Sequence, residues 1–269
     1  MQSHEIVNGA VIATVFSAML VLERLRPLRR QVEPKLRRLA RNLTTGGVAY
    51  AVVTLLGAPL LVPLAKWVAA RRIGLLNLAG ITGMTHVVLA IVLLDYTLWI
   101  WHFASHRIAF LWRFHLVHHV DRDLDSSTAL RFHFGEHALS ILYRAAQVTL
   151  IGASVEAVWA WQLVLFASIL FHHANVELPV AVERWLVRVV VTPRMHGIHH
   201  SDRFRETNSN WASLFTAWDY LHGTMLLDVP QNEITIGVPA YAHARDVTLG
   251  RILAMPFRRQ RDDWQHGSR

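Results

Sequence analysis

Long apolar runs occupy most of the first 171 residues of this 269-residue chain and set the strongest limit on its fold. Hydrophobic residues make up 53% of the sequence and charged residues only 17%, against ~25% charged in an ordinary soluble domain. A run of about 20 apolar residues is long enough to cross a bilayer as a helix. We therefore expect an all-α integral membrane bundle of about four to five spanning or hairpin helices, with apolar regions at residues 6–22, 46–70, 84–101 and 139–171.

Two of these regions depart from a simple span. Residues 139–171 are too long for one crossing and carry Gly152 near their middle, so we expect a helical hairpin of two short or tilted segments. Region 46–70 contains Pro59 and Pro63, which predict a kink that a packed bundle tolerates. The first region carries its positive charge after the apolar core, which indicates an uncleaved span and not a signal peptide.

Positive charge is concentrated between the first two apolar regions. Residues 24–41 contain eight lysines or arginines, whereas the turn at Arg71 and Arg72 contains two. Because cytoplasmic loops are enriched in these residues, we expect a basic cytoplasmic loop at 24–41. The net charge of +8 is therefore attributed to membrane orientation, and nucleic-acid binding is not expected.

This orientation places every histidine cluster on one side of the membrane. We divide the chain into N-terminal transmembrane helices at residues 1–101 and a catalytic region at 102–269. The second region includes the 139–171 hairpin and a cytoplasmic helical cap that carries a histidine-rich di-metal site. The expected location is the bacterial inner membrane, with this site on the cytoplasmic face.

Seventeen histidines are present, and most of them fall in four short clusters. Because an α-helix has 3.6 residues per turn, steps of three or four residues return to one helical face. A lone buried histidine is usually a hydrogen-bonded core residue, but repeated imidazoles on one face suit iron, zinc, copper or nickel. The clusters are HFASH (102–106), HLVHH (115–119), FHH (171–173) and HGIHH (196–200).

The number of clustered histidines indicates two metal ions. The three boxes supply eight imidazoles and the adjacent pair adds one or two, which fits two metals with four or five nitrogen ligands each. Adjacent histidines such as His118 and His119 are expected to serve one metal each. Asp95, seven residues before His102, is expected to accept an N–H from a ligand histidine. The absence of cysteine excludes thiolate ligation.

The boxes and their flanks resemble the fatty acid hydroxylase / sterol desaturase superfamily of integral-membrane di-iron oxygenases. The segment DYTLWIWH (95–102) is similar to the aromatic run that leads into the family's first box. TALRFHFGEH (128–137) is similar to its Thr-x-x-Arg-x-His-Pro-x-Glu segment, with Phe134 in place of proline. TPRMHGIHHS (192–201) and NWASLFTAWDYLHGT (210–224) match its C-terminal signature.

The resemblance implies the site residues. His173 is favoured over His172 because it begins the family's His-Ala-Asn element, and His137 is expected to belong to the core of the cap. The residues expected to support the site are Asp95, His133, Asn175 and Asp219, with direct metal contact left open for His133. The expected metal ligands, all of them also catalytic except His173, are His102, His106, His115, His118, His119, His173, His196, His199 and His200.

The implied activity is O2-dependent hydroxylation or desaturation of a C–H bond in a sterol or fatty-acyl lipid, at two iron ions (Fe2+/Fe3+). Because the chain has no cysteine and no nucleotide motif, electrons must come from a cytochrome b5-like protein, a ferredoxin or a flavin reductase. Arginines near the cap are candidates for docking an acidic donor, with a solvated or headgroup-facing surface as the alternative: Arg184, Arg188, Arg203 and Arg205.

Three other classes of protein compete with this interpretation. A membrane zinc hydrolase would use the same histidines with Glu136 as base, although the H-E-x-x-H motif is absent. A metal transporter should place polar ligands at mid-membrane, whereas these clusters lie at span ends. A haem protein with two histidine ligands would use far fewer imidazoles. Metal analysis, O2 consumption and reduced spectra distinguish these classes.

Overall fold

The computed structural model describes residues 2–262, with side chains from Asn8 onward, and its only regular elements in that range are helices. The long helices are α1 (Gln2–Leu25), α2 (Lys35–Val52), α3 (Ala58–Ala70), α5 (Gly83–Arg107), α7 (Phe134–Ile151) and α8 (Val155–His173). The short helices are α4 (Leu75–Leu78), α6 (Ala109–His119), α9 (Val180–Leu186), α10 (Pro193–His199), α11 (Phe204–Thr207), α12 (Ala217–His222) and α13 (Leu249–Ala254). The predicted all-α class is confirmed.

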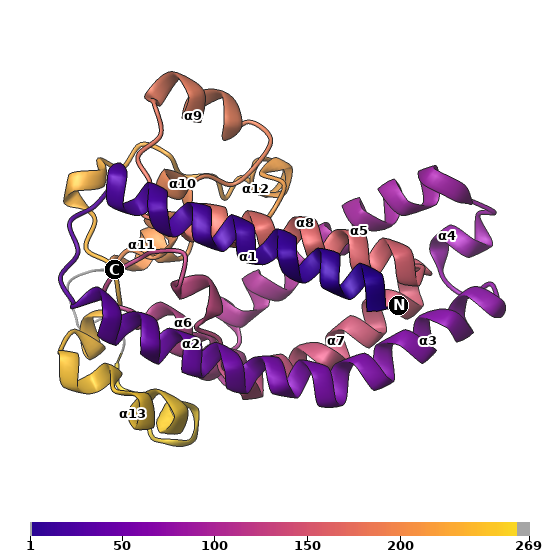
Figure 1. The fold of residues 1–269 in the computed structure, drawn as a ribbon, viewed down its shortest axis with the longest axis horizontal. Helices are drawn as coiled ribbons and strands as arrows, with labels where there is room; N and C mark the ends of the chain where they lie inside the picture. Colours follow the sequence, from indigo (N-terminus) through magenta and orange to yellow (C-terminus); the bar gives the residue numbers. More distant parts are fainter. Residues whose placement is uncertain (1, 263–269) are drawn as a thin grey trace.

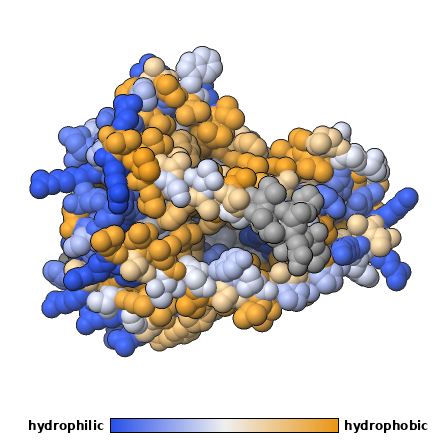
Figure 2. All heavy atoms as spheres, viewed as in Figure 1, coloured by the Kyte–Doolittle hydropathy of each residue, from blue (hydrophilic) through white to orange (hydrophobic). Residues whose placement is uncertain are grey.

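The long helices run side by side, and the short helices α9 to α13 gather at one end of them as a cap (Figure 1). Four segments are long and apolar enough to cross a membrane, which confirms an integral membrane bundle. Figure 2 shows apolar residues over the flanks of the long helices and hydrophilic residues at both ends of the bundle, with more of them at the cap end. The four segments are Asn8–Leu25, Lys35–Leu78, Gly83–Arg107 and Val155–His173.

Residues 35–70 of the second segment form one nearly continuous helical rod. A π-helical turn, Val53–Gly57, joins α2 directly to α3. Pro59 lies in the first turn of α3, where its missing N–H breaks few helical bonds. The predicted irregularity is therefore present, but it lies in the widened turn before the prolines.

The basic segment 24–41 is not a single loop, so this prediction was wrong in its bounds. Helix α1 continues to Leu25 and α2 begins at Lys35, which leaves only residues 26–34 between them. Arg38 and Arg41 lie on α2 and are buried, at 1% and 8% exposure, instead of facing solvent or lipid. Their charges are neutralised because Arg38 and Arg41 reach Asp121 at 2.9 and 3.3 Å.

Asp121 is the centre of a buried ion-pair network that joins α2 to the end of α6. Arg131 lies 3.6 Å from the same carboxylate, and Asn42 donates to it at 3.0 Å. Burial alone would raise the pKa of Asp121, but Arg38, Arg131 and Arg41 outweigh burial and lower it to about 2. Asp121 therefore stays ionised and fastens the segment after α6 to α2.

The apolar region 139–171 forms the predicted hairpin. Helix α7 ends at Gly152, whose φ of 79° is a left-handed helix stop. Ser154 then caps α8 by accepting a hydrogen bond from the backbone N–H of Ala157. Side chains of α5, α7 and α8 pack in one core between the helices, including Leu94, Val148 and Trp161.

Candidate metal centre

Four helices bring the histidine clusters to the same place. Ile108 is extended (φ −97°, ψ 111°), so α5 stops and α6 folds back against its last turn. Helix α8 contributes its C-terminal turn, which holds His172 and His173. Helix α10 begins with Thr192 as its cap and Pro193 in its first turn. These two residues fix the start of the helix that carries the last histidine box, residues 196–200.

The histidines fall into two groups that are each able to hold one metal ion, with the ligand atoms of a group within 4.8 Å of one another. All of these side chains are buried except the partly buried His106. We name the groups by their size. The five-histidine group is His102, His106, His115, His119 and His199, and the four-histidine group is His118, His173, His196 and His200.

Helical spacing decides which group each histidine joins. Residues four apart, such as His115 and His119, differ by about 40° around a helix and share a group. Adjacent residues differ by about 100°, so His118 and His119 point to different groups, as do His199 and His200. This arrangement agrees with the expectation that adjacent histidines serve one metal each.

In the four-histidine group the Nε2 atoms converge on one point. Nε2 of His173 lies 3.1 Å from Nε2 of His118 and 3.0 Å from Nε2 of His196. Nε2 of His200 lies 3.1 Å from that of His196. Two nitrogens that share a metal at about 2.1 Å are about 3.0–3.4 Å apart, so the group fits an ion without rearrangement.

In the five-histidine group, four of the Nε2 atoms are buried without a hydrogen-bond partner among the described residues. These atoms belong to His106, His115, His119 and His199. Unpaired buried nitrogens are costly, because they lose hydration and gain nothing in return. A bound cation would satisfy them, so the donor set fits a metal here as well.

The opposite ring nitrogens are held by hydrogen bonds that fix the tautomer. Nδ1 of His102 donates to the Trp211 carbonyl at 2.7 Å, and Nδ1 of His199 donates to the Ser209 carbonyl at 2.8 Å. Nδ1 of His115 donates to Glu136 Oε1 at 2.9 Å. Each bond leaves the lone pair on Nε2, which faces the group.

The imidazoles outside the membrane spans are held neutral. Burial, followed by the neighbouring histidines, lowers the pKa of His118, His119, His196 and His200 well below its usual value. Burial lowers the pKa of His199 to about 3. Neutral rings offer lone pairs instead of positive charge, which is the state that metal binding requires.

Asp219 supports the five-histidine group through the backbone. Its carboxylate accepts from the N–H groups of Trp211 and Ala212, at 3.1 and 2.9 Å, and from Trp99 Nε1 at 3.0 Å. These bonds position the Trp211 peptide, whose carbonyl holds His102. The sequence did not reveal the Trp211 and Ser209 carbonyls, because a main-chain acceptor has no residue signature.

Two of the expected supporting residues have other partners. Asp95 accepts from Phe215 N–H at 3.1 Å and Trp218 Nε1 at 2.7 Å, so the predicted bond from a ligand histidine is wrong. His133 caps α7, where Nδ1 accepts from Gly135 N–H at 3.0 Å, and its Nε2 donates to the Leu253 carbonyl. It is therefore outside both histidine groups, and neither metal contact nor contact with a ligand is present.

Asn175 acts at the end of α8. Its Oδ1 accepts from Arg29 N–H and its Nδ2 donates to the Arg29 carbonyl, both at 2.8 Å, which ties the 26–34 segment to the turn after His173. His172 lies next to His173 but belongs to neither group. His137 lines a cavity instead of filling the core of the cap, so that expectation was wrong.

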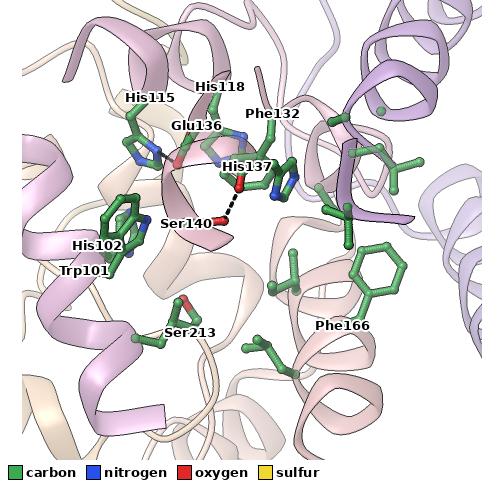
Figure 3. A pocket seen from close by; sticks show the side chains of 18 of the residues that line it. Trp101, His102, His115, His118, Phe132, Glu136, His137, Ser140, Phe166 and Ser213 are labelled. Atoms are coloured by element: carbon green, nitrogen blue, oxygen red, sulfur yellow. Dashed lines mark hydrogen bonds and ion pairs between the residues drawn. The ribbon is translucent and has the colours of Figure 1, made fainter. Parts of the chain in front are cut away.

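An apolar cavity of about 280 Å³ leads from the histidines into the membrane helices. His102, His115 and His118 line one side of it, and Phe166 lies on the opposite side (Figure 3). The remaining wall comes from α2, α5, α7 and α8 and includes Leu98 and Leu165. The cavity thus places an elongated apolar molecule next to both histidine groups.

Comparison with known proteins agrees with this geometry. The Fatty acid hydroxylase family model matches residues 87–224. Ornithine lipid hydroxylase OlsE of Rhizobium tropici is 30% identical over 65% of this chain and 51% of its own length. Cholesterol 25-hydroxylase of Mus musculus is 24% identical over 53% of this chain and 47% of its own. Alkylglycerol monooxygenase of Xenopus tropicalis is 27% identical over 52% of this chain and 29% of its own.

The chain thus spans about half the length, or less, of the curated relatives it matches. No solved structure matches it.

Proposed function

This chain belongs to the fatty acid hydroxylase family, and from that premise we propose that it is a membrane-bound, iron- and O2-dependent enzyme that hydroxylates a lipid C–H bond. The observation that carries the proposal is the placement of two buried histidine groups at the end of an apolar cavity. Sequence relatives named as lipid hydroxylases and monooxygenases support hydroxylation over desaturation.

The proposed reaction needs electrons from outside the chain. One atom of O2 enters the C–H bond and the other leaves as water, which consumes two electrons and two protons. The chain has no cysteine, so it has no thiolate-bound cluster to deliver them. We therefore propose a separate donor protein of the cytochrome b5, ferredoxin or flavin reductase type.

Two irons bound by the nine grouped histidines would supply the oxidising power that no side chain has. The residues of the chain do the rest. The cavity wall binds the lipid and keeps water from the reacting bond. Glu136 and the Trp211 carbonyl hold His115 and His102 in the orientation that a metal needs.

The zinc hydrolase alternative would give Glu136 two roles. Glu136 is the carboxylate that the sequence offers as the base, and a base there would also have to hold His115, because Glu136 Oε1 accepts the Nδ1 hydrogen of that ring while Oε2 has no partner among the described residues. Metal analysis of the purified protein separates the two activities. Iron together with substrate-dependent O2 consumption supports the oxygenase, whereas zinc without O2 consumption contradicts it.

The deciding experiment removes one histidine from each group. His118→Ala and His199→Ala should each abolish O2-dependent product formation in membranes supplied with reductant and lipid extract. His243→Ala, which removes an exposed histidine outside both groups, should leave it intact. Full turnover by either grouped variant, with normal membrane insertion, would contradict the proposal.

We also propose an orientation for the protein. Its membrane is the bacterial inner membrane, and the histidine site lies on the cytoplasmic face of that membrane. The segment between α1 and α2, which contains Arg30, lies at the cap end of the bundle, and the turn between α3 and α4, which contains Arg72, lies at the other end (Figure 1). Because the chain is free of cysteine, single cysteines at these exposed positions report the orientation. An impermeant thiol reagent added outside should label Arg72→Cys and spare Arg30→Cys, and the reverse pattern would overturn the assignment.

A further inference from the structure

Arg144 lies where two cavities meet inside the helical bundle. The first is the apolar cavity beside the histidines, and the second, of about 440 Å³, extends between α1, α3, α7 and α8. Both cavities are lined by Arg144, and the wall residues that they share come from α2, α7 and α8: Tyr50, Val53, His137, Ser140, Leu165, Phe166 and Ile169.

Within residues 8–262, whose side chains the structure describes, the Arg144 guanidinium has no anionic partner. Among the described residues, no carboxylate lies within ion-pair distance of it, and none accepts a hydrogen bond from it. Its one recorded contact is with the face of Trp161, whose ring centroid lies 5.0 Å from Cζ. A ring face compensates a buried cation only in part. By contrast, Arg131 in the cap lies 3.6 Å from Asp121.

Three polar side chains of α7 near Arg144 donate to other groups. The Tyr143 hydroxyl donates to the Thr97 carbonyl at 2.6 Å, and Gln147 Nε2 donates to Thr97 Oγ1 at 2.6 Å. Ser140 donates to the carbonyl of His137 at 2.8 Å (Figure 3). Since no described residue accepts a hydrogen bond from Arg144, its donors can meet a molecule that occupies the cavities.

We propose that Arg144 binds an anionic group, a carboxylate or a phosphate, on the lipid substrate. The proposal rests on the proposed function, because it assigns the substrate class of the same cavity. An arginine among apolar helices is costly without a partner, and its planar fork of donors matches both anions. The charged group would thereby be held at one fixed point in the wall.

The position of Arg144 along α7 determines which part of the lipid reaches the metal groups. Glu136, which contacts His115, precedes Arg144 by eight residues, or roughly 12 Å along the helix axis. A lipid held at Arg144 would present a bond at about this distance from its charged group. The arginine would thus determine where along the chain oxidation occurs.

Binding of matched amphiphiles tests the proposal without any turnover. The metal-loaded protein in phosphatidylcholine nanodiscs, kept free of O2 and reductant so that no turnover occurs, is titrated with dodecanoate, dodecyl phosphate and dodecanol at a pH where both acids are ionised. Charge-assisted hydrogen bonds should make one or both anions bind about 10- to 100-fold more tightly than the alcohol. The anion that binds more tightly identifies the anionic group of the substrate as a carboxylate or a phosphate. Equal binding of all three probes overturns the proposal.

Variants then assign the preference to one side chain. Arg144→Gln should bind all three probes alike, and Arg144→Lys should keep part of the preference for the anions. Arg188→Gln is the matched control, because Arg188 also lies over a ring, that of Trp185 at 4.6 Å, but on the exposed surface. A preference that survives in Arg144→Gln overturns the assignment. Anion preference without lipid oxidation would refute the proposed function alone, and oxidation without anion preference would refute only the role of Arg144.

Discussion

The side chains of His115 and Glu136 meet through one hydrogen bond of 2.9 Å, and this bond links α6 to the first turn of α7. Glu136→Gln keeps the shape of the acceptor but removes its charge, so His115 becomes a weaker ligand. Loss of such a supporting bond typically lowers metal affinity about 10- to 100-fold. Iron retained after dialysis against a graded chelator series measures the effect. Glu156→Gln, at an exposed position in the first turn of α8, should retain iron like the unmodified protein.

His172 and His173 are neighbours with different expected roles. His173 Nε2 lies within 3.1 Å of two other ligand nitrogens, whereas His172 belongs to neither group. His173→Ala should therefore lose the metal of the four-histidine group, and His172→Ala should keep both metals. Metal content per chain by elemental analysis distinguishes the two variants. Equal metal loss in the His172→Ala and His173→Ala variants would show that the five- and four-histidine groups are not the sets of metal ligands.

Asp121→Asn should destabilise the protein where α2 packs against the end of α6. The substitution leaves Arg38, Arg41 and Arg131 without their shared buried anion, which typically costs about 3–5 kcal/mol for a broken buried pair. The unfolding temperature in detergent should fall by several degrees. Asp228→Asn, at an exposed aspartate, is the control and should leave it unchanged. An unaltered Asp121→Asn protein would mean that the network adds nothing to stability.

Gly197→Ala should disturb the last histidine box. A methyl group at Gly197 would overlap the Arg29 guanidinium, which is held there by the Pro193 carbonyl and by Gln231. Displacing Arg29 from this packed position should lower both stability and metal retention. Gly47→Ala places a methyl in open space on α2 and should be neutral or stabilising by about 0.5–1 kcal/mol. The comparison of their unfolding temperatures and iron contents checks the prediction.

Helical periodicity explains why the histidine boxes were predictable. A spacing of four residues puts two side chains on nearly the same helical face whatever the tertiary structure, so the pairing of His115 with His119 follows from the sequence. The division between His118 and His119 follows from the same rule. The identity of the supporting acceptors does not, because the carbonyls of Trp211 and Ser209 are features of the chain path.

The failures have equally specific causes. Asp95 is two turns from His102 and therefore lies on the same helical face. Two turns are also about 11 Å along the helix axis, which is too far for a hydrogen bond, so the Asp95 carboxylate accepts one from Trp218 instead. The burial of Arg38 depends on Asp121, more than 80 residues away, and charge counting along the chain cannot detect that pairing. Arg144 lies within the 139–171 region, where average hydropathy conceals a single charge.

The nine grouped histidines come from α5, α6, α8 and α10, and the last of them to be synthesised is His200. A growing chain therefore has neither metal site complete until α10 has left the ribosome and packed beneath α8. We expect metal capture to follow this packing, so the metal content of a preparation would report the share of molecules in which all four helices have assembled.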